Sequence, residues 1–142
     1  MKLHATMTHP GRTTVIPSDL AAVPPLQEEI GTVVGKAFAE HEAFAVKMAV
    51  EEALVNAIKH GNQLDPAKTV TVTWVLHAER FEVRITDQGP GFNPDDVPDP
   101  TSPENLERPC GRGLLLIRYY MTDVSFHDAG RTIAMFKARG NQ

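Results

Sequence analysis

Three short segments of the chain contain polar side chains and glycines that could hold a magnesium nucleotide: EEALVNAIKHGN at 51–62, DQGPGF at 87–92 and GRGLLLI at 111–117. In the first segment a carboxylate, a carboxamide and an imidazole recur every fourth residue, at Glu52, Asn56 and His60. This spacing places them on one side of a helix, which is predicted over 42–60 with Gly61 as its stop signal. The other sides are mostly aliphatic, so the polar side is expected to face a cavity, although a solvated side of an ordinary amphipathic helix would have the same pattern.

The second segment follows a predicted strand. Apolar and polar residues alternate over 81–86, which is the period of a half-buried strand, and Asp87 comes directly after it. Gly89 and Gly91 would let the backbone turn sharply and approach a ligand, while the Asp87 carboxylate could accept a hydrogen bond from an exocyclic amine. An ordinary turn closed by an Asx-type hydrogen bond is the alternative.

The third segment is predicted to be a flexible turn that leads into a helix. Gly111 and Gly113 come directly before the apolar run at 114–117. The start of a helix offers unpaired amide donors and the positive end of the dipole, so a phosphate could bind there with Arg112 supplying charge, although a plain helix start has the same residues. Neither glycine pair completes the dinucleotide pattern GxGxxG, and the chain contains no GxxxxGK[ST] loop. Rossmann and P-loop nucleotide sites are therefore excluded at the level of motifs.

A segment rich in proline and acidic residues, 93–110, separates the second motif from the third. The segment has few apolar residues and so can bury little apolar surface, and long loops of this kind are often lids or binding loops. Because it lies between two glycine motifs, we predict a nucleotide lid, with a passive surface loop as the alternative.

The order of these features resembles that of the GHKL nucleotide-binding fold, which gyrases, heat-shock chaperones, mismatch-repair proteins and histidine kinases share. That order is a helix with E-x-x-x-N, D-x-G-x-G after a strand, a proline-rich lid, and G-x-G before a helix. The small size of the chain and the segment EEALVNAIKHGN are most similar to the bacterial anti-sigma factor serine/threonine kinases, over about residues 40–137.

The resemblance implies that ATP and Mg²⁺ are the ligands and assigns roles to the motif residues. It implies that Asn56 ligates the magnesium through its side-chain oxygen, that Glu52 is the catalytic base, and that Asp87 binds the adenine amino group. Lys59 and His60 could contact phosphates or the ribose. The glycines that would shape the nucleotide pocket are Gly89, Gly91, Gly111 and Gly113.

The physical chemistry agrees with those roles. Magnesium prefers hard oxygen ligands and keeps several waters while it bridges phosphates, so one carboxamide oxygen is a sufficient protein ligand. A hydroxyl that attacks phosphorus must lose a proton, and the Glu52 carboxylate could accept it. A phosphoacceptor histidine needs no such base, because a neutral imidazole already has a lone pair.

The function expected from the resemblance is an ATP-dependent kinase that phosphorylates an anti-sigma antagonist protein and sequesters a sigma factor. The first alternative is a binding module whose affinity for a partner depends on ATP, with little or no catalysis. The second is a detached histidine-kinase catalytic domain, which is less favoured because Glu52 is present and no phosphoacceptor helix precedes the motifs. Members of the resembled family are commonly homodimers, which implies that this chain pairs with itself.

Length and composition are consistent with one cytoplasmic ATPase domain over 1–142. The formal net charge of −4 gives no basic surface for direct nucleic-acid binding. The single cysteine, Cys110, excludes an internal disulfide, and no apolar run is long enough for a membrane span. The six histidines have no zinc-site spacing with cysteine.

The expected fold is an α/β (α+β) two-layer sandwich, with a mixed, largely antiparallel sheet and helices on one face. A helical stretch over 19–39, interrupted at Pro24-Pro25, is expected before the motif helix, and a hairpin over 68–77 and 80–86 after it. The remaining expected elements are an early strand at 13–16, a helix over about 112–121, and closing strands at 123–127 and 131–138.

Overall fold

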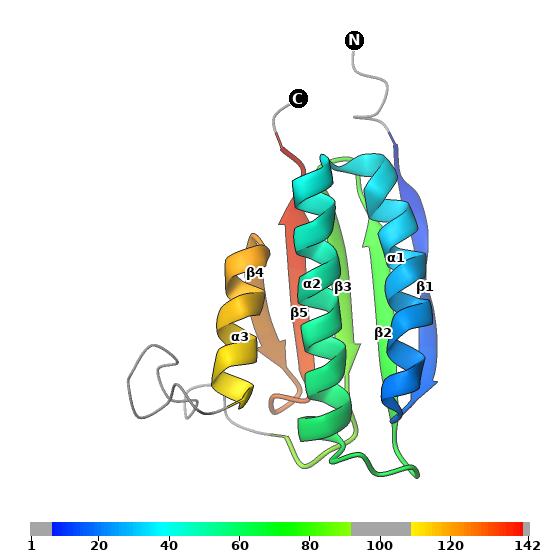
Figure 1. The fold of residues 1–142 in the computed structure, drawn as a ribbon, viewed down its shortest axis with the longest axis vertical. Helices are drawn as coiled ribbons and strands as arrows, with labels where there is room; N and C mark the ends of the chain where they lie inside the picture. Colours follow the sequence, from blue (N-terminus) through cyan, green and yellow to red (C-terminus); the bar gives the residue numbers. More distant parts are fainter. Residues whose placement is uncertain (1–6, 92–108, 141–142) are drawn as a thin grey trace.

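Five strands form one sheet in the computed structural model, which describes residues 7–91 and 109–140; the predicted lid at 93–110 lies almost entirely outside these ranges. The strand order across the sheet is β1-β2-β3-β5-β4 (Figure 1). The strands are β1 His9–Pro17, β2 Thr69–Leu76, β3 Arg80–Thr86, β4 Asp123–His127 and β5 Thr132–Ala138.

Every pairing between these strands is antiparallel, so the sheet lacks the parallel pair that a mixed sheet would contain among its described strands. The connections give the reason. β2–β3 and β4–β5 are hairpins, and two helices lie between β1 and β2, so the chain returns in the opposite direction. One helix connects β3 to β4, which makes those two strands run the same way, but β5 lies between them.

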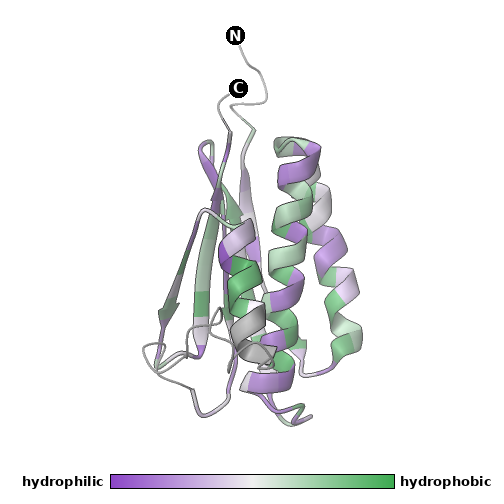
Figure 2. Cartoon of the chain, turned by 60° about the vertical axis from the view of Figure 1, so that its left-hand side comes forward, coloured by the Kyte–Doolittle hydropathy of each residue, from purple (hydrophilic) through white to green (hydrophobic). Residues whose placement is uncertain are grey.

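The helices cover one face of the sheet (Figures 1 and 2). They are the 3₁₀ turn η2 Leu20–Ala22, α1 Val23–Ala37, α2 Glu40–Asn56, the π-helical turn η3 Ala57–Gly61, and α3 Pro109–Tyr120. This arrangement confirms the predicted two-layer sandwich with helices on one face of the sheet.

None of the helices in the described ranges is long and apolar enough to cross a membrane.

The proline pair lies at the beginning of α1, so the interruption expected at Pro24-Pro25 within the helical stretch over 19–39 is wrong: the helix begins there. Pro24 and Pro25 lie in the first turn of α1, where amides have no partner within the helix and a missing N–H costs nothing. The preceding residues form η2, where the Asp19 side chain accepts a hydrogen bond from the Ala21 amide at 2.9 Å.

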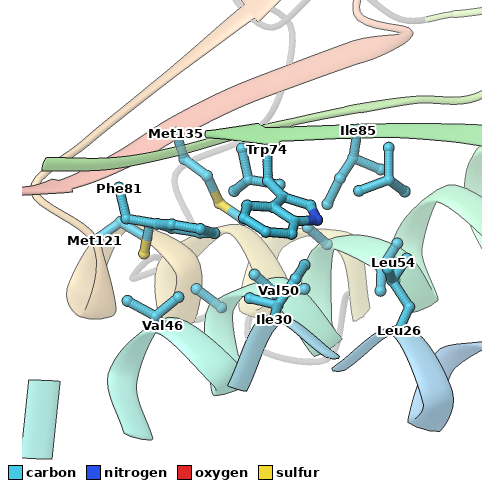
Figure 3. Packing of buried hydrophobic residues seen from close by; sticks show 14 of the residues in the cluster. Leu26, Ile30, Val46, Val50, Leu54, Trp74, Phe81, Ile85, Met121 and Met135 are labelled. Carbon is cyan, nitrogen blue, oxygen red and sulfur yellow. The ribbon is translucent and has the colours of Figure 1, made fainter. Parts of the chain in front are cut away.

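The core lies between the sheet and the helices, and the predicted strand alternation is confirmed there. Val70, Val72, Trp74 and Leu76 of β2 are all buried, as are the apolar residues of β3. Trp74 is 2% exposed, and Figure 3 shows its ring between the sheet and the Ile30 and Val50 side chains of α1 and α2.

The two ends of the described fold lie on the same side of the molecule. β1 begins and β5 ends at one end of the sheet, as measured along the strands. The end of α2 and the loop after β3 lie at the opposite end (Figure 1). A hydrogen bond of 2.7 Å from Arg139 Nη1 to the Met7 carbonyl joins the two ends.

Candidate nucleotide site

Two polar side chains of α2 face the backbone of α3. Glu52 and Asn56 lie one turn apart and are half-buried. A Cβ atom built on Gly113 of α3 would lie 2.8 Å from Glu52 Oε2 and 2.7 Å from Asn56 Nδ2. The absence of a side chain at Gly113 therefore leaves room for both polar groups, and three of the residues named by the motifs come together here.

Glu51 and Glu52 are neighbours in sequence but have different surroundings. Gln27 Nε2 of α1 donates a hydrogen bond of 3.0 Å to Glu51 Oε1 and another of 3.1 Å to the Lys47 carbonyl. Glu51 is thus bound to α1, on the side away from Gly113. Within the described ranges Glu52 makes no hydrogen bond and no ion pair.

A π-helical turn changes the spacing after Asn56. The Asn62 amide donates to the Ala57 carbonyl at 2.8 Å, five residues back, so η3 is wider than an α-helical turn. The i, i+4, i+8 alignment expected for His60 is not maintained through this turn. Lys59 and His60 are exposed, and neither side chain makes a hydrogen bond or ion pair within the described part of the chain.

Asp87 lies at the end of β3 with its carboxylate directed at η3. The Gly89 amide donates to Asp87 Oδ1 at 2.8 Å, which is the Asx-type turn that the sequence offered as an alternative. A Cβ on Gly61 would overlap Asp87 Oδ2, so the carboxylate packs directly on that glycine. Burial raises the pKa of Asp87, an effect that the Gly89 amide, Arg131 and Lys68 oppose and that Asp128 reinforces.

The loop after Asp87 lies between η3 and the β4–β5 turn. A Cβ on Gly89 would overlap the Gly61 carbonyl. Gly91 has a φ of +81°, and a Cβ there would overlap the Ala129 carbonyl on the other side. The loop thus needs glycine at both positions, since the backbones on either side approach too closely for a side chain.

Asn62 supports this loop from within, and the sequence motifs did not identify it. It is fully buried; its Oδ1 accepts from the Gln88 amide at 2.7 Å, and its Nδ2 donates to Ser18 Oγ at 2.7 Å and the Thr69 carbonyl at 2.9 Å. An asparagine after a helix-stop glycine is also typical of an exposed turn. Only its partners, which lie far away in the sequence, distinguish this role.

Arg131 supports the loop from the other side and was also not identified. Its Nε donates to the Gly89 carbonyl at 2.8 Å and its Nη2 to the Pro90 carbonyl at 3.2 Å. An arginine next to a hairpin turn gives no signal in a single sequence, because most such arginines are solvated.

The third motif is positioned differently from the expectation. α3 begins at Pro109, so Gly111 and Gly113 lie inside the helix and do not form a turn before it. Proline is favoured at the first position of a helix, which accounts for the earlier start. The side chain of Arg112 lies outside the described part of the structure, so its predicted contribution stays a prediction.

The described residues contain no cluster of three or more His, Cys, Asp or Glu that could hold a metal ion.

Residues 16–137 match the histidine kinase-like ATPase domain family, and the chain belongs to this family. Among similar proteins is the serine-protein kinase RsbW of Bacillus mycoides, 30% identical over 107 residues, which cover 70% of this chain and 66% of the relative. RsbW of Listeria monocytogenes serotype 4a is 32% identical over 99 residues, which cover 65% of this chain and 63% of the relative. The matches thus span just under two thirds of these relatives.

A solved structure has the same fold. The crystal structure of the RsbU and RsbW domains of Rv1364c from Mycobacterium tuberculosis matches 92% of this chain and 32% of that chain, with a TM-score of 0.63 and 11% identity. The α+β fold and the resemblance to this ATPase family are therefore both confirmed.

Proposed function

We propose that the chain binds Mg²⁺-ATP where α2, the Asp87 loop and α3 meet, and transfers the γ-phosphoryl group to a serine or threonine of a partner protein. The observation that carries the proposal is the approach of Gly113 to Glu52 and Asn56, with hypothetical Cβ distances of 2.8 and 2.7 Å. This approach brings a carboxylate and a carboxamide of α2 against the second turn of α3. Such a pair suits a general base and a magnesium ligand beside phosphate-binding amides.

The chemistry of the donor groups fits both ligands. A carboxylate such as that of Asp87 can accept a hydrogen bond from the adenine amino group through the oxygen that the Gly89 amide does not occupy. The Asn56 side-chain oxygen is a hard ligand of the kind that magnesium prefers. When bound, the cation would neutralise charge on the phosphates.

The transfer step assigns one task to Glu52. Its carboxylate accepts the proton of the seryl hydroxyl as the oxygen attacks the γ-phosphorus. The new O–P bond forms while the bond to the β–γ bridging oxygen breaks, and ADP leaves. The serine-protein kinase names of the relatives favour a hydroxyl acceptor.

The proposed partners are an anti-sigma antagonist protein as the phosphate acceptor and a sigma factor as the sequestered protein, and a homodimer is the proposed assembly. These assignments follow from the family resemblance. An ATP-dependent binding module without catalysis is the competing function, and the next experiment separates the two.

The test compares the adjacent carboxylates of α2. We expect Glu52→Gln to lower phosphoryl transfer by about 10²–10⁴-fold, the usual contribution of a general base, while ATP affinity stays within about one order of magnitude. Glu51→Gln is the matched control and should keep transfer close to that of the parent, because Glu51 contacts Gln27. Calorimetry measures Mg²⁺-ATP binding, and mass spectrometry measures phosphate on candidate antagonist proteins from the same genome.

Two outcomes would contradict the proposal. If adenine nucleotides produce no heat in calorimetry, the nucleotide site is wrong. If the parent protein binds ATP but transfers no phosphate to any candidate and forms no ADP, the binding module becomes the better account.

A further inference from the structure

Arg131 contacts the Asp87 loop at both of its ends. Its backbone carbonyl accepts the Asp87 amide at 2.9 Å. Its Nε donates to the Gly89 carbonyl at 2.8 Å, and its Nη2 donates to the Pro90 carbonyl at 3.2 Å. One residue beside the start of β5 therefore fixes where the loop begins and where it turns back.

Gly89 connects this contact to the carboxylate. Its carbonyl is held by Arg131 Nε, and its amide donates to Asp87 Oδ1 at 2.8 Å. A movement of Gly89 would therefore change the direction of the Asp87 carboxylate. Arg131 acts on that carboxylate through a chain of two hydrogen bonds.

The opposite side of the loop is already fixed. Gly89 packs so tightly on the Gly61 carbonyl that a Cβ would overlap it, and the Gln88 amide donates to buried Asn62 at 2.7 Å. The loop cannot shift toward η3 because backbone atoms block it. Loss of the Arg131 side chain would release the loop on the other side.

We propose that Arg131 is a positioning residue for base recognition, because it fixes the direction in which Asp87 presents its free oxygen to the exocyclic amino group of an adenine nucleotide. The inference rests on the proposed nucleotide function. It adds a residue whose described side-chain hydrogen bonds go to the Asp87 loop and to the Asp128 carbonyl.

Charge and positioning must be separated in any test. The charged groups that act on Asp87 are Arg131 and Lys68, which attract its carboxylate, and Asp128, which repels it. Lys68 makes no side-chain hydrogen bond to the loop within the described ranges. Lys68→Met therefore removes one positive charge and keeps the loop contacts, whereas Arg131→Lys keeps the charge and loses the paired contacts of the guanidinium.

The experiment compares the affinities of ATP and purine riboside triphosphate, which is ATP without the exocyclic amino group. In the parent protein we expect ATP to bind about 10–100-fold more tightly, the effect of one hydrogen bond to a charged acceptor. In Arg131→Met this ratio should fall toward one, measured well above the pKa of Asp87. The affinity for purine riboside triphosphate should stay within a few-fold of that of the parent.

The control variants have opposite expectations. Lys68→Met should keep the ratio at high pH and lose it at a higher pH than the parent as the solution is acidified. Arg131→Lys should lower the ratio although the charge is retained, and it serves as the second variant if Arg131→Met does not fold.

The outcomes distinguish this inference from the proposed function. A parent protein that does not bind ATP, or binds both nucleotides equally, contradicts the nucleotide function or the role of Asp87. A parent that discriminates, with the same ratio in both Arg131 variants, overturns the positioning role alone. An equal loss of affinity for both nucleotides also overturns it, because the amino group would then not be the group affected.

Discussion

Asp87 is a carboxylate in a position where burial opposes its ionisation. Its pKa is raised mainly by burial, and the Gly89 amide, Arg131 and Lys68 only partly compensate. The folded state therefore binds a proton more readily than the unfolded state. Retention of an ionisable group at such a position is typical of a residue kept for binding and not for stability.

The first residue-scale prediction concerns stability against pH. Since the folded pKa lies above the ordinary value of 3.8, the ionised carboxylate lowers the free energy of unfolding as pH rises through that window. Asp87→Asn should therefore have a higher Tm than the parent at neutral pH, and the difference should disappear as pH falls below the ordinary value. Thermal unfolding over a pH series is the measurement.

The same variant should lose adenine recognition, with ATP affinity lower by about tenfold or more. A variant that is less stable than the parent at neutral pH would contradict the view that Asp87 is kept at a cost to folding. Asp128→Asn is the control, because it removes a charge that also raises the pKa of Asp87 without removing the proposed base contact.

At this scale the sequence predicts the residues whose spacing is local. Glu52 and Asn56 share a side of one helix, and Asp87 follows an alternating strand, so short-range periodicity locates them. Their predicted roles stay predictions. Asn62 and Arg131 could not be found, because each acts through backbone groups that lie 26 and 42 residues away in the chain.

At the scale of elements, the contact between α2 and α3 determines the geometry of the candidate site. Gly113 lies where α3 approaches the polar side of α2, and the atoms nearest to its hypothetical Cβ are the far ends of two flexible side chains. Those ends can move at little cost in stability. A methyl group at position 113 would therefore leave the packing of α2 on α3 intact but would displace the side chains of Glu52 and Asn56.

We predict that Gly113→Ala folds with a free energy of unfolding within about 1 kcal/mol of the parent, since alanine favours a helix by roughly that amount over glycine. Phosphoryl transfer should fall by about 10²-fold, because Glu52 and Asn56 must move aside to make room for the methyl group. A displacement of about 1 Å in a catalytic group commonly lowers the rate by that factor. Denaturant unfolding and the transfer assay measure the two effects.

Gly35→Ala in α1 is the matched control, because nothing lies within 4 Å of a Cβ at that position. It should gain roughly 0.5–1 kcal/mol and keep full activity. Full transfer activity in Gly113→Ala would show that the approach of α3 to α2 is not part of the working site.

The expected elements agree closely with four of the five strands and less well with the helix ends and with β1, which begins at His9 and not at 13. The hairpin and the two closing strands lie within one or two residues of their predicted bounds, because alternation and turn residues are local signals. The π-turn at Ala57–Gly61 and the early start of α3 were not predicted. Both depend on backbone hydrogen bonding and packing that residue types alone do not specify.

At the scale of the whole molecule, one buried tryptophan reports on both layers. Trp74 belongs to β2, an interior strand of the sheet, and its ring centroid lies 6.0 Å from that of Phe81. Figure 3 shows it between the sheet and α1 and α2. Separation of the helices from the sheet would expose its ring. Its fluorescence is therefore a probe of global unfolding.

We expect Mg²⁺-ATP at about 100 times its Kd to raise the free energy of unfolding by about 2.7 kcal/mol, because only the folded state would bind it. For a chain of this size the Tm should rise by several degrees, followed through Trp74 fluorescence. Asp87→Asn should show a much smaller rise at the same ATP concentration. An identical Tm with and without nucleotide would contradict binding to the folded chain.

The placement of both ends of the described fold at one end of the sheet has a consequence for attachment. A surface, a fluorophore or a neighbouring domain joined near Met7 or Arg139 would be held at the end of the sheet opposite the end of α2 and the loop after β3 (Figure 1). The candidate site would then face outward from any such anchor. A fold arranged in this way can be carried on a longer polypeptide, or immobilised on a sensor chip by either terminus, without its ligand-facing end being covered by the tether.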